Sequence, residues 1–185
     1  RGWHYAYINA SDRYGSPAAI EIFDAFYTQL LRQHQLAPQV VLEGFSRGGL
    51  YAFNFAATYP ARVAALYLDA PALDLRSWPG YKKSHWAEVA ENYGLTVAAL
   101  ETAAVSPLAR IDPVVRAGIP IIGVSGDADT VVPLAENLAV LVQRYRAAGG
   151  LIEVIIKPGA GHSPHSLADP APIVDFILQH HAPSR

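Results

Sequence analysis

The stretch that decides the fold is LEGFSRGGLYAF, residues 42–53. One apolar run ends at Leu42 and another begins at Leu50. Between them, Gly44, Ser46 and Gly48 occupy alternate positions, as G-x-S-x-G. This pattern is typical of a sharp turn between a strand and a helix that exposes the serine hydroxyl at the end of the strand. We interpret both glycines as steric requirements, because a Cβ atom at either would collide with the adjacent strand or helix. The alternative is a glycine-rich turn whose serine only caps the helix.

The sequence around this turn predicts alternating strands and helices. Because the strand runs are continuously apolar, they favour a parallel sheet covered by helices on both faces. We therefore predict an α/β fold with a mostly parallel, doubly wound sheet, formed by a single domain over residues 1–185 with a small insertion near 70–117 as a possible cap or lid. The predicted strands are 5–8, 39–43, 63–68, 121–125 and 151–156, and the predicted helices are 17–35, 48–59, 86–93, 96–104, 134–148 and 171–181.

Candidate partners of the serine follow two later strands. A serine nucleophile needs a base, usually histidine, which is oriented by a carboxylate. GDADTVVP supplies Asp127 and Asp129 after the strand at 121–125, and KPGAGHSPH supplies His162 and His165 after the strand at 151–156. In such sheets ligands bind beyond the carboxyl ends of the strands, so the placement fits. Asp69 also follows a strand, and we interpret it as a turn or cap carboxylate.

Together, GFSRGG, GDADTVVP and PGAGHSPH resemble the three landmarks of the α/β-hydrolase superfamily, over roughly residues 3–181. The chain looks most similar to its bacterial esterase-like members. This resemblance implies Ser46 as nucleophile, Asp129 as acid and His162 as base, because Asp129 matches the D-x-x-V-P spacing and His162 the glycine-histidine position. We then expect Asp127 to hydrogen-bond within its own turn, and His165 either to line the pocket or to make a surface contact.

Acyl transfer also needs hydrogen-bond donors for the oxyanion that develops on the substrate. One donor should be the backbone N–H of Arg47, the residue after the nucleophile. In the superfamily the second donor lies on a loop that follows an earlier strand. That strand would lie in the sheet between the predicted strands at 5–8 and 39–43. Either these two strands pair directly, or an upstream segment of the protein is missing from this sequence, which we favour. The site also resembles the glucuronoyl esterases, which implies that the Arg47 guanidinium reaches the oxyanion. A surface arginine paired with an acid is the alternative.

The insertion offers candidate substrate contacts. The superfamily resemblance implies a cap or lid there, and aromatic side chains suit a sugar or an aromatic acyl group. Tyr14, after the first predicted strand, should face the same mouth. Ordinary packing of a short excursion is the alternative for the whole segment. The insertion residues concerned are Trp78, Tyr81 and Trp86 for stacking, and Lys82 and Lys83 for an acid group.

Composition narrows the function classes. The chain has no cysteine, which excludes disulfides and thiol nucleophiles, and its formal charge of −2 without charge runs indicates neither a nucleic-acid nor a membrane-surface partner. Histidine spacing gives no metal site, and we expect no cofactor. We expect a soluble bacterial protein, with the cytoplasmic or secreted location left open.

Two functional hypotheses remain. The first is a serine hydrolase that cleaves a carboxylic ester, such as a carbohydrate or short-chain acyl ester, through an acyl-enzyme. The second is a non-catalytic binding module or inactive fragment of a hydrolase, which the absent oxyanion strand favours and the complete serine, aspartate and histidine set disfavours.

Overall fold

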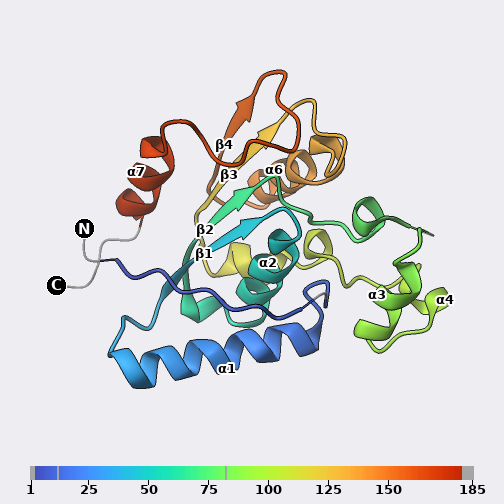
Figure 1. The fold of residues 1–185 in the computed structure, drawn as a ribbon. Helices are drawn as coiled ribbons and strands as arrows, with labels where there is room; N and C mark the ends of the chain where they lie inside the picture. The colour runs from blue at the N-terminus through green and yellow to red at the C-terminus, as the bar shows by residue number, and fades with distance from the viewer. Residues whose placement is uncertain (1–2, 12, 82, 181–185) are drawn as a thin grey trace.

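The core of the fold is one sheet of four parallel strands (Figure 1). The computed structural model describes residues 3–11, 13–81 and 83–180. The strands lie in the order β1-β2-β3-β4, so each pairs with its neighbour in the sequence. This confirms the predicted α/β fold class. The strand bounds are β1 Val40–Phe45, β2 Val63–Asp69, β3 Ile121–Gly126 and β4 Ile152–Lys157.

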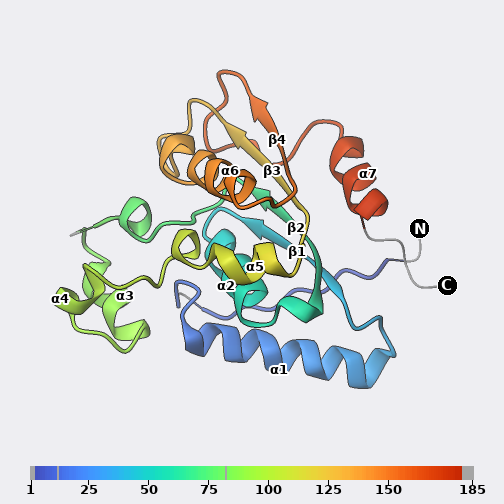
Figure 2. The same ribbon diagram turned by 180° about the vertical axis from the view of Figure 1, so that it is seen from behind.

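Helices cover both faces of this sheet (Figures 1 and 2). On one face, α7 packs through Ile173 and Phe176 against Tyr67, Ile122 and Val124 of β2 and β3. The other face carries the larger core, with α2, α5 and α6. The helices are α1 Pro17–His34, α2 Gly48–Thr58, α3 Trp86–Asn92, α4 Val97–Leu100, α5 Ile111–Arg116, α6 Leu138–Ala147 and α7 Ala171–His180, and the short helical turns are η1 Pro60–Arg62, η2 Arg76–Gly80, η3 Pro107–Ala109 and η4 Leu134–Glu136.

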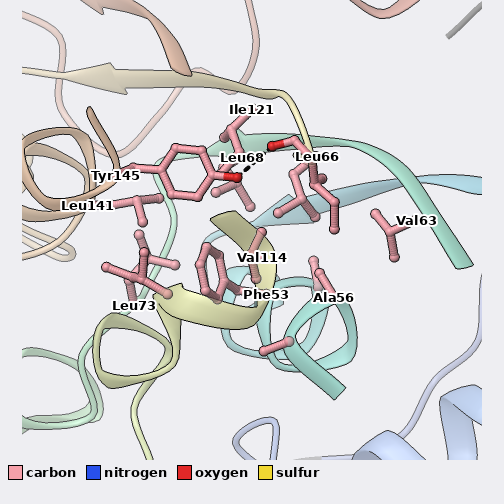
Figure 3. Packing of buried hydrophobic residues seen from close by; sticks show 14 of the residues in the cluster. Phe53, Ala56, Val63, Leu66, Leu68, Leu73, Val114, Ile121, Leu141 and Tyr145 are labelled. Carbon is pink, nitrogen blue, oxygen red and sulfur yellow. Dashed lines mark hydrogen bonds between the residues drawn. The ribbon is translucent and has the colours of Figure 1, made fainter. Parts of the chain in front are cut away.

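The larger core explains why α2 is apolar all round. Phe53 and Leu50 have no exposed surface, and nearly every residue of α2 is buried because the helix lies between the sheet, α1 and α5. Figure 3 shows Phe53 and Val114 facing Leu66 and Leu68 of β2, with Tyr145 of α6 beside them. The buried Tyr145 hydroxyl donates to the Ile119 carbonyl at 2.6 Å, so its only polar atom is satisfied. This packing fixes the strand end from which Ser46 projects.

The strand predicted at residues 5–8 is wrong. The segment forms no strand, and Tyr5 and Tyr7 are 82% and 75% exposed. Its composition favours extended structure, but a strand also needs a neighbour that completes its hydrogen bonds. The alternative in which this segment pairs directly with the strand before the serine, which we did not favour, is therefore also wrong. In the described part of the chain, β1 pairs only with β2.

Two helices differ from their predicted extents. The helix predicted at 96–104 is reduced to α4, in which only Leu100 is buried, so little apolar surface supports a longer helix. The helix predicted at 134–148 divides at Asn137, whose buried side chain accepts the N–H groups of Leu73 and Asp74 and donates to Ser77 Oγ and the Pro133 carbonyl. These bonds link the segments after β2 and β3. The final helix was predicted to reach His181, which lies outside the described residues.

None of the helices in the described ranges is both long enough and apolar enough to cross a membrane.

Candidate active site

Ser46 sits on a strained turn between β1 and α2. Its φ angle is +50°, in the left-handed region where a side chain costs about 1–3 kcal/mol and is held only by surrounding contacts. Those contacts are backbone hydrogen bonds: Ser46 N–H donates to the Asp69 carbonyl at 2.9 Å, and the Ser46 carbonyl accepts the N–H groups of Gly49 and Ala72. The turn is thus tied to the end of β2, and the serine hydroxyl is presented at the carboxyl ends of the strands.

The glycines of this turn divide differently from the prediction. A Cβ on Gly44 would lie 2.9 Å from Ala52 Cβ, which confirms the predicted collision. A Cβ on Gly48 would meet nothing within 4 Å, so the predicted collision at this position is wrong. The crowded glycine at the start of α2 is Gly49, whose added Cβ would lie 2.6 Å from Pro71 Cβ. The helix approaches the segment after β2 at Gly49, one position beyond the motif.

Ser46, Asp129 and His162 meet at one edge of the sheet. His162 Nε2 lies 2.9 Å from Ser46 Oγ, and His162 Nδ1 lies 2.8 Å from Asp129 Oδ2. Both distances fit hydrogen bonds in the tautomer whose Nδ1–H donates to the carboxylate and whose Nε2 accepts the hydroxyl proton. The arrangement can therefore pass a proton from the hydroxyl to the imidazole.

The Asp129 carboxylate is oriented by its own loop. Asp129 is 6% exposed, and its Oδ1 accepts the N–H groups of Val131 and Val132 at 2.8 and 2.9 Å. The second oxygen is left to face His162. Asp127 was expected to bond within its own turn, but among the described residues its Oδ1 accepts Gly159 N–H at 2.6 Å, in the loop that precedes His162. Asp129 thus orients the histidine ring, and Asp127 anchors the loop that carries it.

Two tilted aromatic rings flank the histidine. Phe45 lies against His165 with ring centroids 3.5 Å apart, and its centroid is 5.6 Å from that of His162. His165 is exposed and its centroid lies 6.0 Å from that of His162. The structure therefore brings His165 beside the three central residues, through an aromatic neighbour that the sequence reasoning did not single out.

Carboxylates beneath the site affect one another. Glu43 is exposed as a residue, but neighbouring atoms remove part of the solvent around its carboxyl group; this, and secondarily the nearby charge of Asp69, raises the pKa of Glu43. Burial also raises the pKa of Tyr67 to about 12, with the charges of Asp69 and Glu43 adding to the effect. The nearby carboxylate of Asp69 thus makes ionisation of both neighbours, Glu43 and Tyr67, less favourable.

Tyr14 is buried and packs against the half-buried ring of Trp78. Tyr14 is 6% exposed, its ring centroid lies 6.2 Å from that of Trp78, and its hydroxyl donates to Glu88 Oε2 at 2.9 Å. Burial and this contact raise the pKa of Tyr14 to about 12, whereas hydrogen bonds from His85 and Tyr14 lower the pKa of Glu88. Both rings belong to a core cluster with Leu50 and Val132. They connect the insertion to the serine helix and the Asp129 loop.

The other predicted contact residues are spread over the surface and the insertion. Arg47 is exposed and directly precedes α2. Tyr81 packs edge-on against the buried ring of Trp86, with centroids 5.4 Å apart. Lys83 lies in the turn that leads to α3. Lys82 lies outside the described residues. Within the described ranges, no cluster of three or more histidine or acidic side chains could hold a metal ion.

Besides Phe45, two more structurally important residues escaped the sequence reasoning. Asn137 gave no signal because its predicted position was inside a helix. Lys157 ends β4, and its Nζ donates to the carbonyls of Pro164 and Ser166 at 2.6 and 3.2 Å. A lysine at a strand end that precedes a candidate histidine was visible in the sequence, but its partners are backbone atoms, which no motif records.

Comparison with known proteins now bears on this site. The sequence profile of the prolyl oligopeptidase family matches residues 19–182. The chain belongs to the prolyl oligopeptidase family. It is therefore a member of the α/β-hydrolase superfamily of serine hydrolases, which confirms the resemblance drawn from the three motifs. A comparison with curated protein sequences gives no match.

Solved structures share the fold of this family member. A puromycin-hydrolyzing peptidase of Mycobacterium tuberculosis superposes with a TM-score of 0.68 at 17% identity, over 93% of this chain and 26% of that one. Dipeptidyl peptidase 4 of Porphyromonas gingivalis gives 0.67 at 17% identity, over 88% and 22%. Esterase PE8 gives 0.57 at 19% identity, over 96% and 68%. The chain thus spans about a quarter of the length of the peptidases it matches.

Proposed function

We propose that this chain is the catalytic core of a serine hydrolase that cleaves carboxylic esters through Ser46, His162 and Asp129. The observation that carries the proposal is the continuous path of hydrogen-bond distances, 2.9 Å from Ser46 Oγ to His162 Nε2 and 2.8 Å from His162 Nδ1 to Asp129 Oδ2. A nucleophile, a base and an orienting acid at these distances are the parts that acyl transfer requires.

The reaction follows from these roles. Ser46 Oγ attacks the acyl carbon while His162 Nε2 takes the hydroxyl proton, and the negative charge of Asp129 stabilises the imidazolium that forms. The tetrahedral intermediate expels the alcohol, which receives the proton from His162. Water then attacks the acyl carbon while His162 takes its proton, the bond from that carbon to Ser46 Oγ breaks as His162 returns the proton to Oγ, and the acid leaves. Backbone N–H of Arg47, at the start of α2, is the first oxyanion donor in this proposal, and the Arg47 guanidinium is a candidate second donor.

An ester is the preferred substrate because an alcohol leaves more readily than an amine. The half-buried Trp78 and the exposed Tyr81 support a carbohydrate ester as the refinement, and a short-chain acyl ester is the alternative. The second candidate is peptide-bond hydrolysis, which the family match and the similarity to the two peptidases favour. A panel of p-nitrophenyl esters and aminoacyl p-nitroanilides separates them: the proposal expects kcat/KM on the best ester to exceed that on every anilide, and the reverse order favours a peptidase.

Labelling with a fluorophosphonate probe tests the nucleophile directly. The wild type should be labelled and hydrolyse esters, and Ser46→Ala should lose both by about a thousandfold or more. Ser125→Ala is the matched control, because Ser125 is a buried serine on β3 that a probe cannot reach. A folded wild-type sample that is neither labelled nor active would favour the non-catalytic binding module instead.

A further inference from the structure

Asp69 contacts both halves of the candidate site. It is the last residue of β2. Its backbone carbonyl accepts the N–H of Ser46 at 2.9 Å, and its Oδ2 accepts the N–H of Ser166 at 2.6 Å. Ser166 belongs to the loop that carries His162. A single residue thus joins the turn of the serine to the loop of the histidine, which makes it more than the turn carboxylate that the sequence suggested.

Lys157 holds the same loop from the other side. Its ammonium donates to the Ser166 carbonyl at 3.2 Å and to the Pro164 carbonyl at 2.6 Å. Asp69 and Lys157 therefore take the N–H and the C=O of one residue. Ser166 has a φ angle of +55°, a conformation that a non-glycine residue keeps only when its surroundings impose it. The Asp69 carboxylate at its N–H and the Lys157 ammonium at its carbonyl supply that constraint.

Burial of Asp69 is difficult to explain by stability alone. The residue is 2% exposed, and its Oδ1 is buried with no hydrogen-bond partner among the described residues. A buried carboxylate with an unsatisfied oxygen costs free energy of folding, so its retention needs another reason. A hydrogen bond to the histidine loop offers one.

The loop is already fixed before the histidine. Asp127 Oδ1 accepts Gly159 N–H at 2.6 Å, and Ala128 N–H donates to the Ala160 carbonyl at 3.0 Å. After the histidine, the polar anchors of the loop among the residues that the structure describes are those that Asp69 and Lys157 supply at residues 164–166. Without them His162 would be held by the upstream side of its loop, by its hydrogen bonds with Asp129 and Ser46, and by the Phe45 ring.

We propose that Asp69 and Lys157 are positioning residues that set the distance between the Ser46 hydroxyl and the His162 imidazole, by clamping the peptide groups of Ser166. This inference rests on the proposed hydrolase function. The clamp acts on geometry and leaves substrate binding alone, so it should influence kcat far more than KM.

The test compares variants that remove and retain the clamp. Asp69→Ala removes the acceptor, Asp69→Asn keeps an oxygen acceptor of the same size, and Lys157→Met removes the donors but keeps the apolar stem. The matched controls are Asp169→Ala and Arg146→Met, which lose a carboxylate that accepts Ala171 N–H and a cation that donates to the Ile152 carbonyl. Hydrolysis of a p-nitrophenyl ester is measured per active site, with sites counted by fluorophosphonate labelling.

We expect Asp69→Ala and Lys157→Met each to lower kcat per labelled site roughly ten- to a hundredfold, with KM within about twofold, because small misplacements of catalytic groups cost rates of this order. Asp69→Asn should recover most of the loss, and the controls should stay near the wild type. If Asp69→Ala lowers only the labelled fraction or the melting temperature, at an unchanged kcat per labelled site, Asp69 is structural only and the proposal is overturned. Should Asp69→Ala fail to fold, the half-buried Lys157→Met decides by the same criterion.

Amide hydrogen exchange separates this proposal from the function on which it rests. If the wild type proves inert, the proposed function fails, but exchange at the Ser166 amide can still be followed. Faster exchange at Ser166 in Lys157→Met and Asp69→Ala than in the controls supports the clamp. Exchange equal to that of the wild type overturns it.

Discussion

His162 Nε2 lies 2.9 Å from Ser46 Oγ although 116 positions of sequence separate the two residues. The contact is made by loops that follow β1 and β4, the two outer strands of the sheet in the described part of the chain. It therefore depends on all four strands being in register.

Asp129→Asn should lower kcat about a thousandfold or more. The asparagine amide can offer an N–H to His162 Nδ1, which would put the ring proton on Nε2 and prevent it from accepting the Ser46 proton. The measurement is kcat for a p-nitrophenyl ester at neutral pH, with exposed Asp112→Asn of α5 as the control. A loss below tenfold would show that Asp129 does not select the tautomer.

Gly48→Ala and Gly49→Ala should differ in stability despite being neighbours. An added Cβ at Gly48 meets open space, and alanine favours a helix start, so the free energy of unfolding should stay level or rise by about 0.4–1 kcal/mol. At Gly49 the added Cβ would lie 2.6 Å from Pro71 Cβ, and the loss should be about 1–3 kcal/mol. Urea denaturation of both variants measures the difference, and equal stabilities would contradict the close approach at Gly49.

Arg47→Ala examines the candidate second oxyanion donor. If the guanidinium stabilises the developing charge, kcat should fall by roughly ten- to a hundredfold, somewhat less than for a backbone donor in a fully preorganised site, while KM changes little. Arg47→Lys keeps the charge without the forked geometry, and its kcat should lie between those of the wild type and Arg47→Ala. An unchanged kcat in Arg47→Ala rules the guanidinium out and leaves its backbone N–H as the donor on that residue.

Glu43→Gln should stabilise the protein at neutral pH and leave its stability in acid unchanged. The pKa of Glu43 is raised in the folded state, chiefly by loss of solvent and then by Asp69, so the folded protein holds that proton more tightly than the unfolded chain. The wild type then loses stability as the pH rises from the unfolded pKa through the folded one. The melting temperature of the variant should exceed that of the wild type at pH 7, and the difference should vanish below about pH 4. A constant difference across this range would mean that the Glu43 charge is not responsible.

The sequence predicted the parts of this structure that have a local or periodic signal. Continuous apolar runs placed β1 to β4 within one or two residues, and the G-x-S-x-G spacing placed the turn of Ser46. Long-range facts had no such signal. Tyr5 and Tyr7 have strand-forming composition, but whether a strand forms depends on a partner elsewhere in space. Asn137 divides a helix because of bonds to a loop some sixty positions earlier, which composition cannot express.

The site shows the same division. Chain order and the positions of the strand ends predicted that Ser46, Asp129 and His162 lie together. In the structure these residues lie within hydrogen-bond distance. Their catalytic roles stay predictions. Asp69 and Lys157 were harder to interpret because each binds backbone atoms, and any residue type can supply those. Tyr14 was expected at the mouth of the site and packs against the insertion instead, because its hydroxyl finds a partner in Glu88.

The parallel register of β1 to β4 also determines when the site can exist during folding. Strands of a parallel sheet close large loops, and such long-range pairing comes late and slowly. A slip of one residue in any ladder would displace a loop by about 3.3 Å, more than a hydrogen bond can stretch. Recovery of serine reactivity after dilution from urea is therefore expected to trail the return of helical circular dichroism, and would time the completion of the sheet.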